Sequence, residues 1–157
     1  MAIAEAMSET FACSKRSLIE KLGIKAGFAV AFLGVPEGLR AILGQLPAGV
    51  TVRKGNAGPL DFIHFFTKRR RELETRIPEL KRYLLPHGVL WISWPKWSSG
   101  VETDLNENLV REIALKNSLV DVKVCAVDDT WSGLKLVYRL KDRPKVRNDN
   151  RRQGLPI

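Results

Sequence analysis

The sequence predicts a three-layer α/β fold with a mostly parallel six-stranded sheet that ends in an antiparallel hairpin. Three observations predict it: one short segment is apolar on both faces, strand-like and helix-like segments alternate along most of the chain, and two strand-like segments near the end are joined by a tight loop. A strand without a polar face is usually a central parallel strand covered on both sides. Alternating strands and helices favour a parallel sheet between helical layers.

The central strand is expected at residues 89–94, where large apolar side chains occupy both alternating sets of positions. Pro95 should end this strand because it has no N–H for the sheet ladder. Lys96 and Trp97 follow, in a loop of the kind where open α/β sheets usually hold their ligands.

Before the central strand, Ser14 or Ser17 could cap a short helix that Gly23 ends. Thr67 is expected to cap a longer helix, in which Leu and Ile recur at helical spacing and Pro78 introduces a kink or a second segment. Residues 85–88 (Leu-Pro-His-Gly) signal its end. The expected strands are residues 28–33, 50–53 and 60–66, with a helix at residues 39–46.

After the central strand, Asp104 with Glu107 three residues later predicts the start of a helix. Residues 119–127 and 134–140 predict two strands joined by a hairpin loop at residues 128–133. We therefore expect the order strand–helix–strand–strand–helix–strand–helix–strand–strand.

The length of 157 residues fits one domain. We expect a flexible N-terminus at residues 1–13, a single α/β domain at 14–140, and a basic, disordered tail at 141–157. The formal net charge of +9 is concentrated near the end: from Arg139 onward there are seven basic residues against two acidic ones.

The composition excludes several classes of protein. There is no basic and apolar leader of the secretory type, and no apolar run long enough for a membrane helix. Cys13 and Cys125 lie far apart and make no metal-binding spacing, so we expect no metal site and read both as reduced thiols. These features predict a cytoplasmic protein that does not bind membranes.

The segments "LGIKAGFAVAFLG", "LDFIHFF" and "YLLPHGVLWISW" resemble the first, fourth and fifth strand regions of class I S-adenosylmethionine-dependent methyltransferases. The resemblance lies in topology more than in motif, and it implies a Rossmann-like sheet whose last strand is antiparallel. One helix and one strand of the full fold are missing here, since the second strand leads into the next through a short loop. The expected topology is therefore a reduced form of that fold.

This resemblance makes S-adenosylmethionine a possible cofactor, with Gly34 and Gly38 as the remaining glycines of its turn. The turn departs from the class, because Pro36 lacks an N–H donor and Glu37 places negative charge there. Methyltransferases keep an acidic residue at the end of the second strand to hold the ribose hydroxyls, whereas this chain has Arg53 and Lys54. A turn retained for packing is the favoured interpretation.

A second resemblance covers nearly the whole chain. The strings "LGIKAG", "DFIHFF", "GVLWISWPKWSSGVETDLNEN", "VREIAL" and "LVDVKVCAVDDTWSGLKLVYR" resemble a family of small bacterial proteins. That family carries no assigned activity, so it implies the fold and a bacterial origin but no reaction.

If the two loops that carry tryptophan open at the same sheet edge, their side chains converge with a histidine on the third strand. Histidine exchanges protons near neutral pH, and aromatic walls with a few charged groups are typical of a small-molecule pocket. The alternative is that the histidine is hydrogen-bonded at a strand end and the tryptophans close the core. The candidate ligand-binding residues are Glu37, His64, Lys96, Trp97, Asp128, Asp129 and Trp131.

A basic run stands where the helix dipole disfavours positive charge, which points to an anionic partner or to an ordinary solvated surface. It consists of Lys68, Arg69, Arg70 and Arg71. Together with the tail it could contact nucleic-acid phosphates.

Three functions follow from these patterns. The first is a non-catalytic module, related to methyltransferases, that binds a small molecule or a protein. The second is a methyltransferase with a reduced cofactor site. The third is a nucleic-acid-associated basic protein. No catalytic residue is assigned from the sequence.

Overall fold

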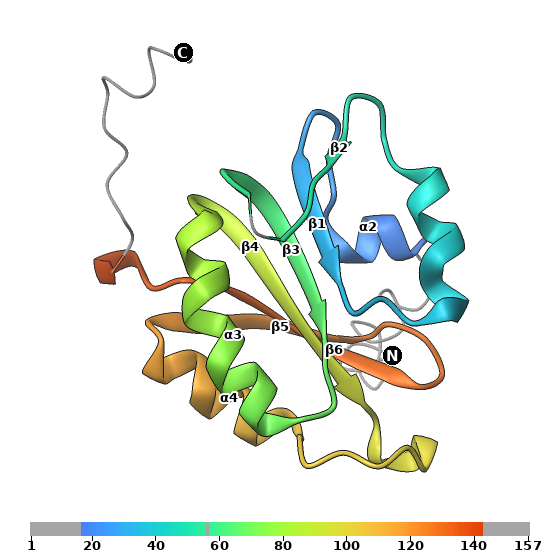
Figure 1. The fold of residues 1–157 in the computed structure, drawn as a ribbon, viewed down its shortest axis with the longest axis vertical. Coiled ribbons are helices and arrows are strands. Elements are labelled where there is room, and N and C mark those ends of the chain that lie inside the picture. Colours follow the sequence, from blue (N-terminus) through green and yellow to red (C-terminus); the bar gives the residue numbers. More distant parts are fainter. Residues whose placement is uncertain (1–16, 56, 143–157) are drawn as a thin grey trace, which may run out of the picture.

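A six-stranded sheet in the order β2-β1-β3-β4-β6-β5 forms the centre of the protein (Figure 1). The structure is a computed structural model that describes residues 17–55 and 57–142. The predicted flexible N-terminus and most of the predicted basic tail therefore lie outside the described residues. The strands are β1 (Ala29–Leu33), β2 (Thr51–Val52), β3 (Leu60–Phe66), β4 (Leu84–Pro95), β5 (Leu119–Ala126) and β6 (Trp131–Tyr138).

The first four strands are parallel, whereas β6 pairs antiparallel with both β4 and β5. This confirms the predicted mixed sheet and its closing hairpin. Among the described residues, no helix stands between β2 and β3, in agreement with the predicted reduced topology. The helices are α2 (Leu18–Leu22), α3 (Arg70–Tyr83), α4 (Glu107–Lys116) and the short 3-10 helices η1 (Glu37–Gln45), η2 (Trp97–Ser99) and η3 (Leu140–Asp142).

The strand β4 is buried on both faces, as its sequence predicts. On one face, Leu90 and Ile92 pack with α3 and α4 in the largest apolar cluster. On the other face, Trp91 packs with α2 and is fully buried. The Trp91 indole N–H donates a 3.0 Å hydrogen bond to the carbonyl of Leu22, so the polar atom of this side chain is satisfied and α2 is fixed to the sheet.

Two local predictions hold only in part. Pro78 starts no second segment and lies inside a continuous α3, at an exposed position where water can satisfy the carbonyl that has no N–H partner. The helix ends just before residues 85–88, at Tyr83, but these residues already belong to β4, which begins at Leu84. Leu60 of β3 pairs with Leu84 of β4, and Phe62 pairs with Val89. The strand β4 therefore has extra residues between these two pairings, and this irregularity accommodates Pro86 and Gly88.

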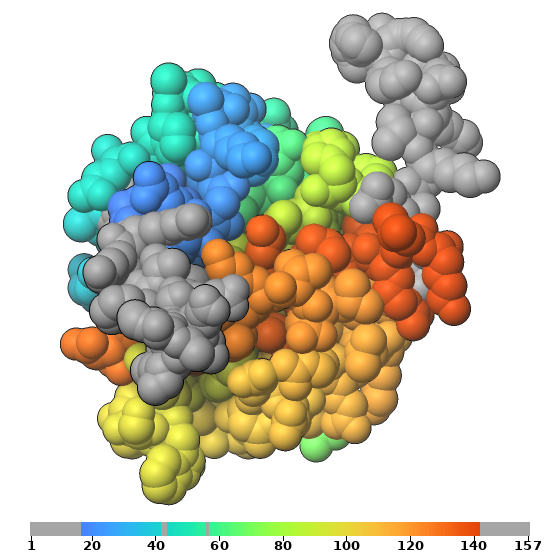
Figure 2. All heavy atoms as spheres, turned by 180° about the vertical axis from the view of Figure 1, so that it is seen from behind, coloured from blue at the N-terminus to red at the C-terminus, as the bar shows by residue number. Residues whose placement is uncertain are grey.

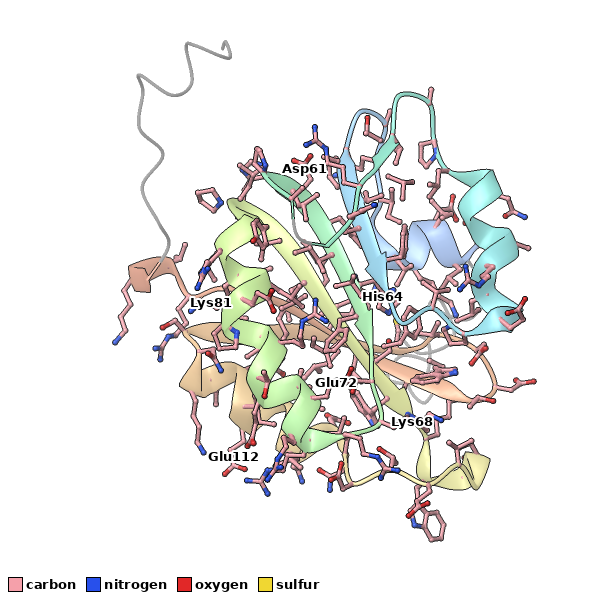
Figure 3. All side chains as sticks on the ribbon, viewed as in Figure 1. Asp61, His64, Lys68, Glu72, Lys81 and Glu112 are labelled. Atoms are coloured by element: carbon pink, nitrogen blue, oxygen red, sulfur yellow. The ribbon has the colours of Figure 1, made fainter. Side chains whose placement is uncertain are left out.

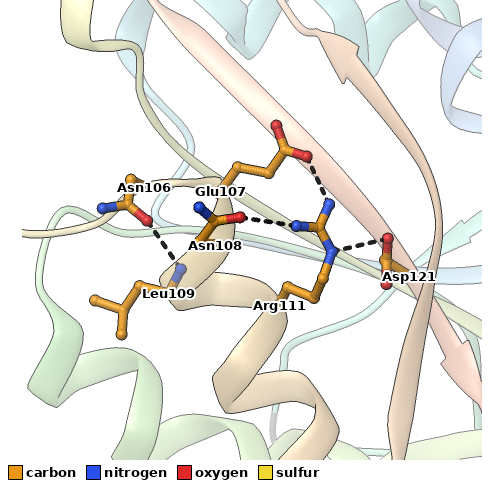
Figure 4. Close-up of polar contacts among 6 residues, drawn as sticks. All are labelled: Asn106, Glu107, Asn108, Leu109, Arg111 and Asp121. Carbon is orange, nitrogen blue, oxygen red and sulfur yellow. Dashed lines mark hydrogen bonds and ion pairs between the residues drawn. The ribbon is translucent and has the colours of Figure 1, made fainter.

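The helix α4 begins later than predicted, because Asn106 and not Asp104 is its N-cap. The Asn106 side chain accepts a 2.9 Å hydrogen bond from the Leu109 N–H (Figure 4). Arg111 then ties the helix to the sheet, since its Nε donates to Asp121 on β5 at 3.1 Å while another guanidinium nitrogen contacts Glu107.

Cys125 is buried and is not a free thiol in the structure, which contradicts the reduced thiol expected for it. The other cysteine, Cys13, lies outside the described residues.

Asp104 caps a different helix from the one that its sequence neighbours indicate. Its carboxylate accepts a 2.7 Å hydrogen bond from the backbone N–H of Arg70, in the first turn of α3, and its own N–H donates to the carbonyl of Lys68. This bond satisfies one of the N–H groups that a helix start leaves without an intrahelical partner, and it places negative charge at the positive end of the dipole.

We expect Asp104→Ala to lower the free energy of unfolding by about 1 kcal/mol, the usual cost of removing an N-terminal cap. Urea denaturation followed by circular dichroism measures it. Glu102→Ala, which removes an exposed carboxylate two residues earlier, is the matched control and should change little. Equal stability losses in the two variants would contradict the capping role.

Candidate functional site

The candidate site lies at the carboxyl ends of β1 and β3. The strand β1 has β2 on one side and β3 on the other, so the chain leaves the sheet in opposite directions at this point. Such a switch point opens a crevice above the strand ends, which is the general ligand position in open α/β sheets.

A cleft of about 440 Å³ occupies this position, and we call it the switch-point cleft. Figure 3 shows Lys68 and Glu72 close to the end of β3, beyond His64. The residues that line the cleft are Gly34, Pro36, Phe66, Thr67, Lys68, Arg69, Glu72 and Trp131.

Thr67 organises the polar side of the switch-point cleft. Its hydroxyl accepts a 3.2 Å hydrogen bond from the Arg69 N–H and donates to the carboxylate of Glu72. Its backbone N–H donates to the carbonyl of Ser93 on β4. Thr67 is therefore buried and fixed, whereas Lys68 and Arg69 are exposed beside it. Sequence reasoning missed Thr67 and Glu72 as site residues; Thr67 directly follows the end of β3, whereas Glu72 lies in the first turn of α3.

Trp131 forms the aromatic wall of the cleft. It is only 8% exposed, and its ring meets Phe66 edge to face at 5.4 Å between centroids. The carboxylate of Asp128 accepts hydrogen bonds from the N–H groups of Thr130 (2.9 Å) and Trp131 (2.7 Å). Asp128 thus shapes the hairpin loop that presents the tryptophan.

The two tryptophan-bearing loops open at the same sheet edge, as expected, because the Lys96 N–H donates a 2.7 Å hydrogen bond to the Thr130 carbonyl. The two tryptophans nevertheless do not share a pocket. Trp97 is 95% exposed and lines a separate cleft of about 490 Å³, which we call the η2 cleft. Its lining is Trp94, Lys96, Trp97, Thr103, Asp104, Leu105, Asn106, Glu107 and Ser132.

The predicted acidic residues Glu37 and Asp129 line neither cleft. The Glu37 side chain is 94% exposed and lies 3.8 Å from the Arg40 guanidinium. Asp129 is exposed on the hairpin loop. The structure therefore brings Trp131 to the switch-point cleft and Lys96 with Trp97 to the η2 cleft.

His64 does not line the switch-point cleft; it lines a separate small apolar cavity with residues of α2 and η1. Its ring is stacked on Phe66 at 4.1 Å between centroids, and its Nε2 lies 2.7 Å from the Ser93 hydroxyl. Its Nδ1 has no hydrogen-bond partner. Burial lowers the pKa of His64 to about 3, so the ring is neutral at physiological pH. His64 is therefore a neutral, buried histidine that is hydrogen-bonded in the core, which agrees with the alternative interpretation of the sequence.

The structure places the residues of the predicted basic run in different surroundings. Lys68 and Arg69 line the switch-point cleft, whereas the Arg70 guanidinium contacts the Glu74 carboxylate on the next turn of α3 at 3.0 Å. Arg71 is exposed and lines neither cleft.

The glycine turn is built for packing against β3. Gly34 has φ +70°, and a Cβ there would lie 2.5 Å from the Phe66 carbonyl oxygen. Only glycine permits this close approach. Gly38 has open space around its Cβ position, and Pro36 cannot donate a hydrogen bond. Arg53 and Lys54 stand exposed at the end of β2. These residues do not fit S-adenosylmethionine as methyltransferases hold it.

Within residues 17–55 and 57–142, no three His, Cys, Asp or Glu side chains are grouped so that they could hold a metal ion. The same residues include no helix that is long and apolar enough to span a membrane.

The buried His64 should make stability depend on pH. In the unfolded chain this ring binds a proton near pH 6.5, whereas in the folded protein it does so only near pH 3. The unfolded state therefore binds more protons across this window, and stability should fall as pH decreases from about 6.5 towards 3, by up to about 1.4 kcal/mol per pH unit. Urea unfolding at several pH values, compared with His64→Gln, measures this contribution. An identical pH slope in the variant would contradict it.

Gly34→Ala should destabilise the protein by about 2 kcal/mol, because it combines a positive φ with a backbone collision. Gly38→Ala is the matched control and should cost less than about 0.5 kcal/mol. Chemical denaturation of both variants tests this, and equal costs would show that the turn is not constrained by β3.

No family model and no curated protein sequence matches the chain, so its predicted membership of a small bacterial family stays an expectation. Solved structures do match it. The ribosomal protein L11 methylase from Lactobacillus delbrueckii subsp. bulgaricus is 17% identical with a TM-score of 0.56, covering 83% of this chain and 79% of its own.

Two further solved structures are similar to this chain. A TehB-like SAM-dependent methyltransferase from Corynebacterium glutamicum is 12% identical with a TM-score of 0.55, covering 88% of this chain and 99% of its own. Magnesium protoporphyrin IX methyltransferase from Synechocystis with bound SAH is 9% identical with a TM-score of 0.52, covering 87% and 84%. At this level of identity the likeness concerns the fold, and the fold is that of the class I S-adenosylmethionine-dependent methyltransferases.

Proposed function

We propose that the chain is a methyltransferase-related binding domain that holds a small anionic ligand in the switch-point cleft without transferring a methyl group. The observation that carries this proposal is the composition of that cleft. It combines two exposed cations, Lys68 and Arg69, with an aromatic wall formed by Phe66 and Trp131. An anionic group beside a flat apolar group complements these two sides.

The position of the cations supports an anionic ligand. Lys68 and Arg69 precede the first turn of α3, where the helix dipole adds to their positive charge. The Glu72 carboxylate accepts a hydrogen bond from the Thr67 hydroxyl, and no ion pair among the described residues joins it to Lys68 or Arg69. A carboxylate or phosphate of a ligand would meet two cations and a helix start.

The absence of methyl transfer is proposed from the groups at the strand ends. Arg53 and Lys54 at the end of β2 repel the positively charged sulfonium cofactor and offer no acceptor for ribose hydroxyls. The backbone of Gly34, with its positive φ, packs closely against the Phe66 carbonyl. His64, with its lowered pKa and its cover of Phe66, is poorly placed to act as a general base on a bound substrate.

Binding can be tested with benzoate, which carries one carboxylate and one ring. Titration followed by ¹⁵N–¹H NMR should shift the Trp131 indole and the Lys68 amide, and leave the Trp91 indole in place. The double variant Lys68→Ala/Arg69→Ala should weaken binding by about tenfold or more, as expected when a charge-assisted hydrogen bond is removed. Lys116→Ala, an exposed lysine on α4, is the matched control.

The alternative function is a methyltransferase with a reduced cofactor site, favoured by the fold and by the positive φ of Gly34 in the turn after β1. Calorimetric titration with S-adenosylmethionine separates the two. Absence of micromolar binding agrees with the proposed binding domain, whereas micromolar binding of S-adenosylmethionine would favour the alternative. Benzoate shifts that are unchanged in the double variant would overturn the proposed cleft.

A further inference from the structure

Four lysines gather on the face of the sheet that carries α2, and we call them the lysine strip: Lys21, Lys25, Lys123 and Lys135. Lys123 and Lys135 are direct partners in the antiparallel register of β5 and β6. The Lys135 ammonium lies 3.9 Å from the Cβ position at Gly23, the C-cap of α2. The Lys21 ammonium donates a 2.9 Å hydrogen bond to the Ala126 carbonyl, which ties α2 to the end of β5.

The charges of the lysine strip are incompletely neutralised within the described part of the chain: the Asp128 carboxylate raises the pKa of Lys21, but by less than burial, Lys96 and Lys123 lower it. No ion pair there includes any of the four ammonium groups. The pKa of Lys135 is lowered, first by burial and then by Lys123 and Lys25. Like charges directly opposite each other in a sheet destabilise it, so this arrangement works against folding and is relieved by an anion.

The positive field continues to an exposed aromatic side chain. Lys96 is near enough to Lys21 to lower its pKa, after the larger effect of burial. Next to Lys96, the Trp97 side chain is 95% exposed. Figure 2 shows α2 in dark blue, the β5–β6 hairpin in orange and the η2 segment in yellow on this one side of the molecule, with η2 projecting from the body.

The turn that carries Trp97 is well formed. The Ser99 N–H donates to the Lys96 carbonyl at 3.0 Å, and the Gly100 N–H donates to the Trp97 carbonyl at 3.3 Å. Gly100 adopts φ +79°, a conformation that glycine permits. A hydrogen-bonded turn therefore holds a large indole in water, where it forms no part of the core.

We propose that the lysine strip, Lys96 and Trp97 form a binding surface for single-stranded nucleic acid, with phosphates on the ammonium groups and a base stacked on the Trp97 indole. Proteins that bind single strands without sequence preference combine a basic track with stacking aromatic side chains. Lysine suits this role because it contacts phosphate as a point charge. The surface is distinct from residues 68–71, and the inference does not rest on the proposed ligand cleft.

The single strand is favoured over other phosphate ligands by the layout of the charges. The cations come from α2, the loop after it, both strands of the hairpin and the η2 turn, so they are spread along a surface. Free phosphate would occupy one position on such a track, whereas a polymer occupies several at once. A duplex keeps its bases stacked inside and cannot use the indole.

The test uses the full chain and a fluorescein-labelled oligothymidylate of about fifteen nucleotides, a length within the usual site size for one domain. Fluorescence anisotropy at several salt concentrations should show binding that weakens as salt rises. Lys123→Gln/Lys135→Gln should reduce the slope of log affinity against log salt by about 1.4, or about 0.7 for each phosphate that is no longer neutralised. Lys116→Gln is the matched control and should leave the slope unchanged.

Trp97→Ala should weaken binding about tenfold while the salt slope stays the same, because a stacking interaction releases no counterions. Trp97→Phe should retain most of the affinity. The substituted positions face solvent or partly face it, and the folded state of each variant is checked by denaturation.

Five outcomes would overturn the proposal. The first is no binding of the oligonucleotide, and the second is binding that the lysine and tryptophan variants leave unchanged. The third is displacement of the oligonucleotide by millimolar inorganic phosphate, which would indicate a free-anion site. The fourth is an equally tight duplex complex that is insensitive to Trp97→Ala. Loss of binding in Lys68→Ala/Arg69→Ala alone would likewise overturn it, by assigning the nucleic-acid interaction to the switch-point cleft.

Discussion

The rest of the structure depends on the burial of Trp91 at the centre of the sheet. The indole fills the space above Gly133 on the neighbouring strand, where a Cβ would come within 3.0 Å of the ring. It also donates its N–H to the Leu22 carbonyl and packs beside His64. One side chain thus packs over the β4–β6 pair at Gly133 and fixes α2, while helping to bury the histidine. Burial of a side chain of this size is among the largest single apolar contributions in a core.

The burial of Trp91 can be predicted from the sequence, because a strand with large apolar residues on both faces is stable only where both faces are covered. The leucine and isoleucine stripe of α3 and the terminal hairpin are predictable for the same reason: local periodicity states which face is buried. The sequence therefore predicts the sheet, its parallel part and its antiparallel end.

Interactions between distant segments are not predictable in this way. Asp104 has the pattern of a start for its own helix, yet it caps α3, which is some thirty positions earlier in the chain. Pro78 has the pattern of a break, but its position on the exposed side of α3 makes the missing hydrogen bond tolerable. Trp97 and Trp131 look equivalent as loop tryptophans, although one is solvated and the other packs on Phe66. Solvation of a loop side chain depends on neighbours that local pattern does not specify.

The residues of the candidate site also divide into those that the sequence predicts and those that it does not. The sheet edge of the proposed ligand cleft follows from the strand order, and Trp131 with Lys68 and Arg69 can be recognised from residue type. Thr67 and Glu72 cannot, because their role arises from a hydrogen bond between a strand end and the first turn of a helix. The strand position of His64 indicates the crevice, whereas in the structure Phe66 covers the ring.

Both edge strands of the sheet, β2 and β5, are poorly suited to pairing with a further strand. On one side β2 contributes only two residues, and on the other β5 carries a register irregularity between Asp121 and Lys123. Short, bulged and charged margins resist the addition of a further strand from another chain. Self-association by extending the sheet is therefore disfavoured at either margin, and a macromolecular partner would approach the faces of the layers or the rim above the strand ends.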